Sequence, residues 1–181
     1  MALIIYIPPL IIRREREILT EIRRGLLSLY SHNMVASLKI GSEGFSNNGF
    51  IPSKYTCEGD NINPPLIISG LPMATKTLAL IVEDPDAPKG IFVHWVVWNI
   101  PPTNKIRENT QPGEEGVNDF GKHHYAGPCP PSGVHRYYFK IYALDNFLHL
   151  DPTSTKAGLE TAMSKYVIGF GELIAQYKKK K

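Results

Sequence analysis

Two histidines in this sequence each follow a proline-rich loop and stand at the start of an apolar, alternating run. His94 follows residues 84–88 (DPDAP), and His135 follows residues 127–131 (GPCPP). Apolar alternation is typical of β-strands, and loops at strand ends are where proteins tend to display binding groups. We therefore expect the two imidazoles to meet around one shared cavity.

These residue types suit recognition of a small anion better than covalent catalysis. Imidazole N–H groups donate to phosphate or carboxylate oxygens, and a nearby carboxylate orients the ring and favours its charged form. Asp84 and Asp86 fit that orienting role, or they accept from an ammonium group on a zwitterionic ligand. Gly127 and Pro128 form a turn that lets the backbone approach a ligand, where free N–H groups cradle oxygen atoms. The hydroxyl of Tyr137 adds a further donor.

Two alternatives remain open beside anion binding. In a hydrolase, Ser132 near His135 would be the nucleophile, although it lacks a G-x-S-x-G context. In a metal-dependent enzyme, His94, His135 and an aspartate would hold a divalent ion, although no compact metal-ligand motif is present. We expect no enzyme activity, no metal and no cofactor.

The elements that must position these groups are mainly β-strands. Alternating runs occupy residues 75–83, 92–100 and 136–144, a brief one covers 35–40, and 167–177 ends the pattern as a strand or a short helix plus strand. A helix is predicted over 155–166 with Ser154 or Thr155 as its N-cap. Residues 107–125 read as a long irregular loop, which is typical of functional segments.

Strand parity gives the candidate residues a direction. His135 shares its face with Tyr137, and Asp84 has the parity of the apolar residues that precede it. His94 is predicted to share its face with Phe92, Val96 and Trp98. Both histidines should therefore lie at the rim of the core. A histidine in such a place is more often a packed structural residue than a ligand.

Composition limits the remaining possibilities. The chain has 181 residues, of which 43% are hydrophobic and 20% charged, which predicts one domain with a proper core. Its net charge is +3, and the terminal lysines 178–181 supply four positive charges, so nucleic-acid binding is not expected. Residues 1–33 are predicted to be an extension, helical or poorly ordered, and 34–181 a single domain. We expect no transmembrane segment and a cytoplasmic location.

The only two cysteines, Cys57 and Cys129, lie in separate polar loops. Either they are reduced thiols in a cytosolic protein, or they pair because both loops line the same cavity.

Four motifs together resemble the phosphatidylethanolamine-binding proteins, whose eukaryotic branch includes Raf kinase inhibitor protein. They are residues 84–90 (DPDAPKG), 94–99 (HWVVWN), 118–122 (NDFGK) and 127–137 (GPCPPSGVHRY). The cysteines in YTC and GPCPP look most like the prokaryotic branch. The resemblance spans roughly residues 35–177, although residues 123–125 (HHY) depart from it.

The resemblance implies a central antiparallel β-sheet with a second smaller sheet packed on it, a few peripheral helices and a pocket for phosphoryl groups. The family's pocket positions fall on Asp84, Asp86, His94, Gly127, Pro128, His135 and Tyr137. We therefore expect a binding protein for small phosphorylated or anionic ligands, such as a lipid headgroup, with a regulatory output. Family analogy adds a kinase or protease as a partner to be inhibited, and a homodimer is a further candidate assembly.

Overall fold

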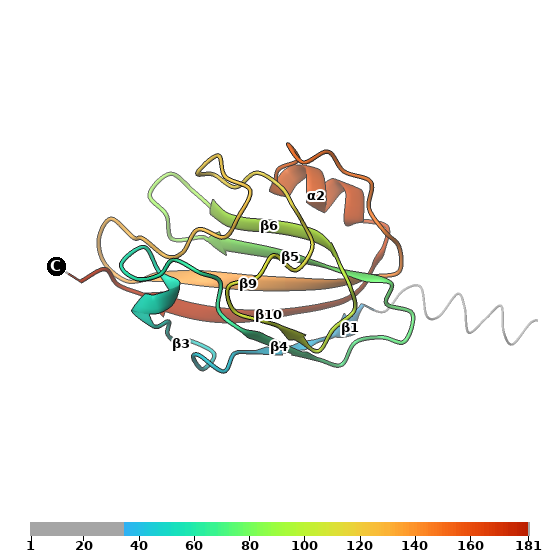
Figure 1. The fold of residues 1–181 in the computed structure, drawn as a ribbon, viewed down its shortest axis with the longest axis horizontal. Helices are drawn as coiled ribbons and strands as arrows, with labels where there is room; N and C mark the ends of the chain where they lie inside the picture. The colour runs from blue at the N-terminus through green and yellow to red at the C-terminus, as the bar shows by residue number, and fades with distance from the viewer. Residues whose placement is uncertain (1–34, 181) are drawn as a thin grey trace, which may run out of the picture. The chain divides into compact units, whose positions relative to one another are not determined.

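The computed structural model of this protein describes residues 35–180 (Figure 1). The predictions for residues 1–33 and for a domain starting at residue 34 lie outside the described residues. Within residues 35–180, no helix is both long enough and apolar enough to cross a membrane.

A large mixed sheet forms the centre of the fold. Its strands run in the order β1 (Ala36–Ser37), β10 (Val167–Tyr177), β9 (His135–Leu144), β5 (Thr77–Asp84), β6 (Phe92–Ile100) and β8 (Glu114–Glu115), and β3 (Gly49–Phe50) pairs with β10 as well. The long strands pair antiparallel, whereas the short β1 and β3 run parallel to β10. The predicted antiparallel centre is therefore correct, and the parallel pairs are confined to one edge.

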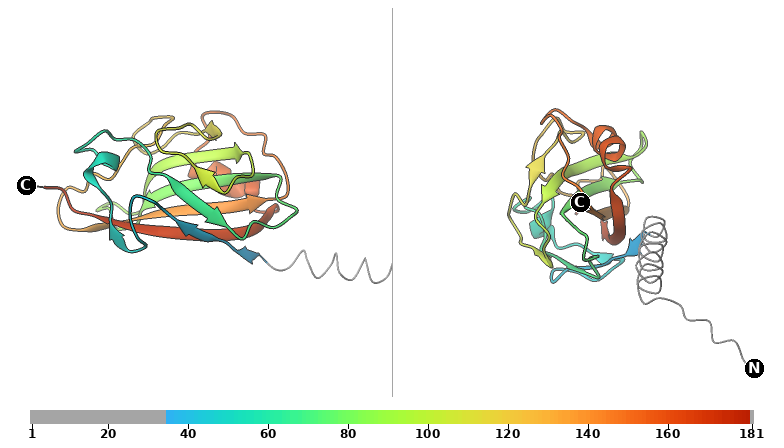
Figure 2. Two further views of the ribbon diagram at one scale, coloured as in Figure 1. Left: turned by 60° about the horizontal axis from the view of Figure 1, so that its bottom comes forward. Right: turned by 90° about the vertical axis from the view of Figure 1, so that its right-hand side faces the viewer.

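A second, smaller sheet packs on one face of the large one (Figure 2). It contains β2 (Lys39–Gly41), β4 (Leu66–Ser69) and β7 (Lys105–Ile106) in the order β2-β4-β7, all antiparallel. The predicted run 35–40 is divided between β1 and β2, which belong to different sheets. The sequence did not predict β4, because its four residues, of which three are apolar, are too few to show a period.

Alternation along the central strands produces two cores. Leu80 and Val82 of β5 join Phe139 and Ile141 of β9 in the core between the sheets. The opposite face of β5 packs against α2 (Lys156–Met163). Every residue of β5 is buried, because this strand lies between β9 and β6 and both of its faces are covered. The mainly β fold with two sheets is therefore confirmed.

The helix is shorter than predicted. It ends at Met163 instead of Tyr166, and Thr155 is its N-cap residue, without a side-chain cap hydrogen bond. A turn closed by the Tyr166 N–H and the Met163 carbonyl leads directly into β10, so the chain leaves the helix early to reach the sheet. The short 3₁₀-helix η1 (Ser53–Tyr55) precedes the loop that carries Cys57.

Candidate functional site

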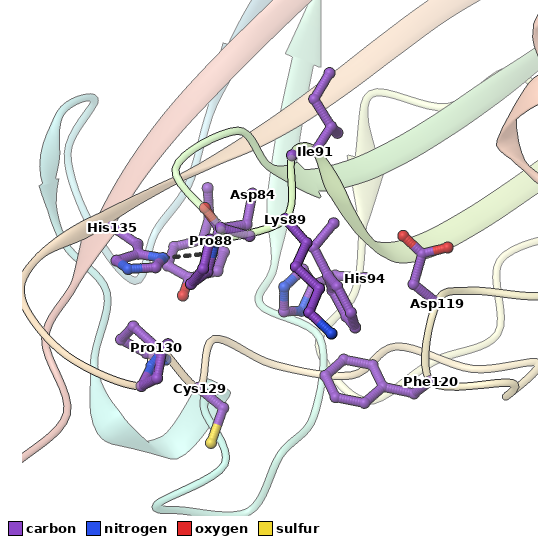
Figure 3. Close-up of a pocket in the computed structure, with 15 residues that line it drawn as sticks. Asp84, Pro88, Lys89, Ile91, His94, Asp119, Phe120, Cys129, Pro130 and His135 are labelled. Atoms are coloured by element: carbon purple, nitrogen blue, oxygen red, sulfur yellow. Dashed lines mark hydrogen bonds and ion pairs between the residues drawn. The ribbon is translucent and has the colours of Figure 1, made fainter.

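A cavity of about 510 Å³ opens at one end of the large sheet. Strand β5 ends there, while the antiparallel β6 and β9 begin there, so the two proline-rich loops lie side by side. The size is within the range of small-molecule sites. The lining residues are Asp84, Ala87, Pro88, Lys89, Gly90, Ile91, Phe92, His94, Asp119, Phe120, Cys129, Pro130, Pro131, His135 and Tyr137 (Figure 3).

Four of the seven predicted site residues line this cavity, namely Asp84, His94, His135 and Tyr137. The other three, Asp86, Gly127 and Pro128, lie close by in sequence but do not line it. The structure thus brings the two histidines together as expected, whereas ligand contact by any of the seven residues stays a prediction.

Asp84 and His135 form a buried pair. The Nδ1 atom of His135 lies 2.8 Å from Oδ2 of Asp84, and the two side chains are 9% and 5% exposed. Because a carboxylate accepts, Nδ1 carries the proton, which leaves Nε2 as the ring nitrogen open to a ligand. The other oxygen of Asp84 accepts from the Asp86 N–H at 2.8 Å, so the carboxylate is held from both sides.

The predicted direction of His94 is wrong in one respect. Val82 pairs with Trp95 but Glu83 pairs with Val93, so His94 is the extra residue of a β-bulge. The bulge shifts parity by one residue. His94 therefore lies with Trp95 on the inter-sheet face, whereas Val96 and Trp98 lie on the helix-covered face. Its ring contacts Tyr137, with the two centroids 5.2 Å apart.

The hydrogen bonds of His94 also define its tautomer. Nδ1 donates to the carbonyl of Ala126 at 2.6 Å, because a carbonyl oxygen can only accept. Burial lowers the pKa of His94 by disfavouring the charged ring, and the Ala126 carbonyl only partly opposes this. The ring is therefore neutral at neutral pH, with an Nε2 lone pair that can accept a hydrogen bond.

Tyr137 provides a buried hydroxyl without a partner. Its side chain is 0% exposed, and the hydroxyl oxygen makes no hydrogen bond within residues 35–180. Burial, reinforced by the nearby charge of Asp84, raises the pKa of Tyr137, so the group stays protonated. An unpaired buried hydroxyl is costly, and a ligand oxygen at the cavity would satisfy it.

Aromatic rings form one wall of the cavity. The Phe92 and Phe120 rings lie 4.8 Å apart in an edge-on arrangement, and each is within 5.5 Å of the His94 ring. In Figure 3, Phe120 lies beside His94 and away from His135. Asp119 holds this loop onto β6, because its carboxylate accepts from the Val93 N–H at 2.7 Å. The wall is suited to an apolar or planar part of a ligand.

The sequence reading left Asp119, Phe120 and Lys89 out of the site, although all three line the cavity. Two signals pointed to Asp119 and Phe120, while Lys89 belongs to the motif DPDAPKG. The long loop 107–125 was expected to be functional, and the motif NDFGK was part of the family resemblance. Neither signal says which of those residues reach the cavity, since that depends on how the loop crosses β6.

Asp86 has a structural partner instead of facing the cavity. Its carboxylate accepts from three nitrogens of Arg136, which are the backbone N–H, Nε and Nη2, at 2.7 to 2.9 Å. The Arg136 hydrogen bonds lower the pKa of Asp86 to about 2. This bridge joins the loop after β5 to the start of β9, and so holds the two edges of the cavity together.

Gly127 and Pro128 pack against the 53–61 segment. The Gly127 N–H, expected to be free, donates to Oδ1 of Asn61 at 2.7 Å, and the Pro128 carbonyl accepts from the Cys57 N–H at 3.1 Å. A Cβ atom on Gly127 would lie 2.4 Å from the Tyr55 carbonyl oxygen. Glycine is needed here because two backbone segments touch, and the predicted oxygen cradle is not formed by this N–H.

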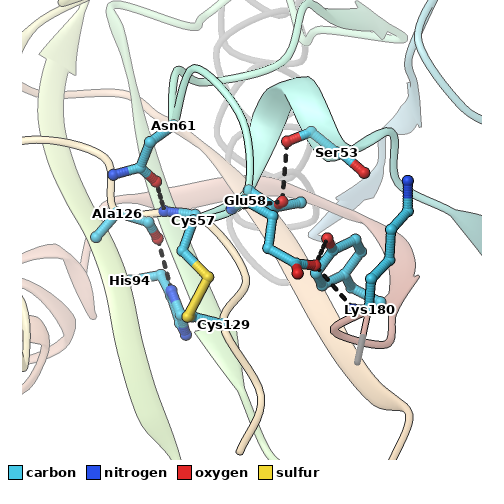
Figure 4. The surroundings of a disulfide bond; sticks show 11 residues. Ser53, Cys57, Glu58, Asn61, His94, Ala126, Cys129 and Lys180 are labelled. Atoms are coloured by element: carbon cyan, nitrogen blue, oxygen red, sulfur yellow. Dashed lines mark hydrogen bonds between the residues drawn. A yellow bond between two sulfur atoms is a disulfide. The ribbon is translucent and has the colours of Figure 1, made fainter.

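Cys57 and Cys129 form a disulfide, with their Cα atoms 5.4 Å apart (Figure 4). Of the two alternatives left by the sequence, the paired one is therefore correct. The expectation that both cysteine loops line the same cavity holds in part, since Cys129 lines it and Cys57 does not.

No group of three or more His, Cys, Asp or Glu residues is arranged to hold a metal ion within the described part of the chain. Asp84 and His135 use their facing atoms on each other. The buried polar atoms left for a ligand are the two Nε2 atoms and the Tyr137 hydroxyl, and Lys89 lines the same cavity. This set is suited to oxygen atoms.

Comparisons with known proteins agree with this architecture. A family model described as phosphatidylethanolamine-binding protein matches residues 41–178. A UPF0098 protein from Pyrococcus horikoshii is 52% identical over 155 residues, which cover 80% of this chain and 78% of that protein. A UPF0098 protein from Methanothermobacter thermautotrophicus is 45% identical over 150 residues, covering 78% of this chain and 99% of that protein.

Two crystal structures share the fold. A phosphatidylethanolamine-binding protein homologue from Chlamydia trachomatis is 40% identical, has a TM-score of 0.77, and is matched over 80% of this chain and 99% of that one. E. coli YbcL, described as a member of the mammalian PEBP family, is 30% identical with a TM-score of 0.74, over 80% of this chain and 100% of that one. The chain therefore belongs to the phosphatidylethanolamine-binding protein family.

Proposed function

We propose that the cavity binds the phosphoryl or carboxylate group of a small ligand that also carries an apolar portion. The observation that carries this proposal is the convergence of two histidines whose Nδ1 atoms are already committed, to Asp84 and to the Ala126 carbonyl. Each ring is thereby held with Nε2 as its only available nitrogen. The unpaired hydroxyl of Tyr137 lies against the same cavity.

The two histidines have different roles in this proposal. His135 binds a ligand oxygen as an imidazolium, because its Nε2 can donate only when both nitrogens carry protons. The Asp84 carboxylate then balances the charge of that ring. His94 is neutral, so its Nε2 accepts from a protonated phosphate oxygen or from an ammonium group. The ligand is thus bound as a partly protonated anion.

The apolar portion follows from size and lining. A phosphate group alone would fill only a small part of 510 Å³, and the remaining wall is formed by Phe92, Phe120, Ile91 and prolines. Aromatic faces bind planar or apolar groups through burial of their surface. Phenyl phosphate should therefore bind more tightly than inorganic phosphate.

We expect that His135→Ala weakens the binding of phenyl phosphate by about tenfold or more. One hydrogen bond to a charged group contributes about 1.5–3 kcal/mol, which corresponds to about 10- to 100-fold in affinity. Calorimetric titration measures this, with thermal unfolding as the test of the fold. His149→Ala is the matched control, because His149 is exposed and remote from the cavity lining. Unchanged affinity in folded His135→Ala protein contradicts the proposal.

We further propose that the site binds without catalysing a reaction. Ser132 is exposed and makes no hydrogen bond with His135, so the hydrolase alternative lacks an activated nucleophile. A regulatory output, through inhibition of a kinase or protease, rests on family membership, and a cytoplasmic location stays a prediction. Hydrolysis of phenyl phosphate that is lost in His135→Ala would overturn the non-catalytic part.

A further inference from the structure

The segment that carries Cys129 and forms one wall of the cavity is hydrogen-bonded to the rest of the fold on both sides of residues 129–134 but not within them. Up to Pro128 the chain is closely held, because Tyr125 donates to the Tyr55 carbonyl, Gly127 donates to Asn61, and the Pro128 carbonyl accepts from Cys57. From His135 onward the chain is paired in β9. Residues 129–134, which we name the pocket loop, make no well-aligned hydrogen bond to another described residue, and the Cys129 backbone only approaches the Tyr137 hydroxyl.

The disulfide is therefore the one specific link between the pocket loop and the described remainder of the chain. Cys129, Pro130 and Pro131 of this loop all line the cavity. Figure 3 shows Pro130 next to His135, with Cys129 between Pro130 and Phe120. Movement of the loop would remove one wall of the cavity and expose His135.

The other end of the disulfide is anchored independently. Glu58, next to Cys57, accepts from the Tyr177 hydroxyl and from the Lys180 N–H (Figure 4). The Asn61 N–H donates to the Lys54 carbonyl, and the Thr56 N–H donates to the Ser53 carbonyl. The segment around Cys57 thus keeps its place without the disulfide, so a break in the S–S bond frees the pocket loop alone.

The disulfide is open to exchange. Cys57 is exposed, while Cys129 is half-buried. Attack by the thiolate of a dithiol reductant on Sγ of Cys57 forms a mixed disulfide and releases Cys129 as a thiolate, which takes up a proton. The second thiol of the reductant then releases Cys57. The dithiol supplies two electrons and is itself oxidised to a disulfide.

We propose that the Cys57–Cys129 disulfide is a redox switch that controls ligand binding at the cavity. Oxidised protein holds the pocket loop closed against the ligand, and reduced protein lets it open. The inference rests on the proposed binding function, since it concerns the regulation of the same site. The chain has no other cysteine, so a thiol reductant acts on this disulfide and on no other cysteine of the protein.

The expected change in affinity follows from the fraction of molecules in which the pocket loop is closed. A cavity that is closed only one tenth of the time binds with a dissociation constant raised tenfold, so reduction should weaken phenyl phosphate binding by about tenfold. Amide hydrogens of the pocket loop should exchange faster after reduction. Those of β9 and β5 should not change, because their hydrogen bonds do not involve the loop.

The experiment titrates phenyl phosphate into oxidised protein and into protein reduced with dithiothreitol, with amide exchange measured on both. The Cys57→Ser/Cys129→Ser double variant is the matched control, and it should bind like reduced protein with and without dithiothreitol. Binding by oxidised protein at the same affinity as reduced protein overturns the switch alone. Absence of binding by the oxidised protein overturns the proposed function. Equal exchange of the pocket loop in both states, or loss of β9 protection on reduction, also overturns the switch.

Discussion

Substitution of Gly127 by alanine is expected to lower the free energy of unfolding by about 3 kcal/mol and to distort the cavity wall. The added Cβ would lie 2.4 Å from the Tyr55 carbonyl oxygen and 2.8 Å from both the Thr56 Cα and the Asn61 Oδ1. The first two are backbone atoms, and the third already accepts from the Gly127 N–H, so none of them can move away without a loss of stability. The two segments must separate, and the hydrogen bonds between them break.

Urea denaturation of the wild type and the variant measures this loss. Gly41→Ala is the matched control, because a Cβ at Gly41 meets nothing within 4 Å, and its effect should stay within about 0.5 kcal/mol. Phenyl phosphate affinity should fall in Gly127→Ala, since the Ala126 carbonyl that orients His94 belongs to the same segment. A Gly127→Ala protein as stable as the control would show that this contact is not tight.

The second large effect concerns Glu83, which is buried beneath α2. Its carboxylate lies 2.6 Å from Nζ of Lys140 and 2.5 Å from Nζ of Lys156, and its side chain is 3% exposed. Glu83→Ala leaves two lysines close together without a counter-charge. We expect a loss of about 3 kcal/mol, the low end for a broken buried pair, since both lysines are partly exposed.

The control for Glu83 is a solvent-exposed ion pair with a similar distance between nitrogen and oxygen. Glu43 and Lys105 lie 2.8 Å apart but are 59% and 42% exposed, so Glu43→Ala should cost less than about 1 kcal/mol. Thermal and urea unfolding of both variants provide the measurement. Equal losses in the two variants would contradict the idea that burial decides the strength of the Glu83 cluster.

The pH dependence of stability should report the same cluster. Burial tends to raise the pKa of Glu83, but the hydrogen bonds from Lys140 and Lys156 outweigh it and lower the pKa below its ordinary value of 4.5. The stabilisation is therefore complete above about pH 4.5 and is lost as the pH falls through the folded-state pKa. Acid titration of Glu83→Gln should show a shallower loss of stability than that of the wild type.

Much of the fold could be predicted because alternation is a local property. The runs that became β5, β6 and β9 are rich in β-branched and aromatic residues, so their existence follows from residue type. The direction of Asp84 and His135 follows from side-chain parity along these strands. The pairing of Asp84 with His135 also requires β5 and β9 to be neighbours in register. The family motifs supplied the topology that joins these strands.

Other features could not be predicted, since they depend on contacts between distant segments. The bulge at His94 follows from how β6 fits beside β5, and one extra residue reverses the face of the ring. The role of Gly127 depends on the 53–61 segment, which is about 70 residues away along the chain. The reach of Phe120 into the cavity depends on Asp119 binding to β6.

The amino-acid sequence alone determined the mainly β class, the two strands that begin with a histidine, and the presence of carboxylates near them, because side-chain period and residue type are properties of short segments. Only the tertiary structure decided the Asp84–His135 pair, the disulfide between Cys57 and Cys129, the ion pair of Asp86 with Arg136 and the volume of the cavity. Those outcomes depend on distances between atoms that many residues separate along the chain, and such distances are set by how the two sheets and their loops pack.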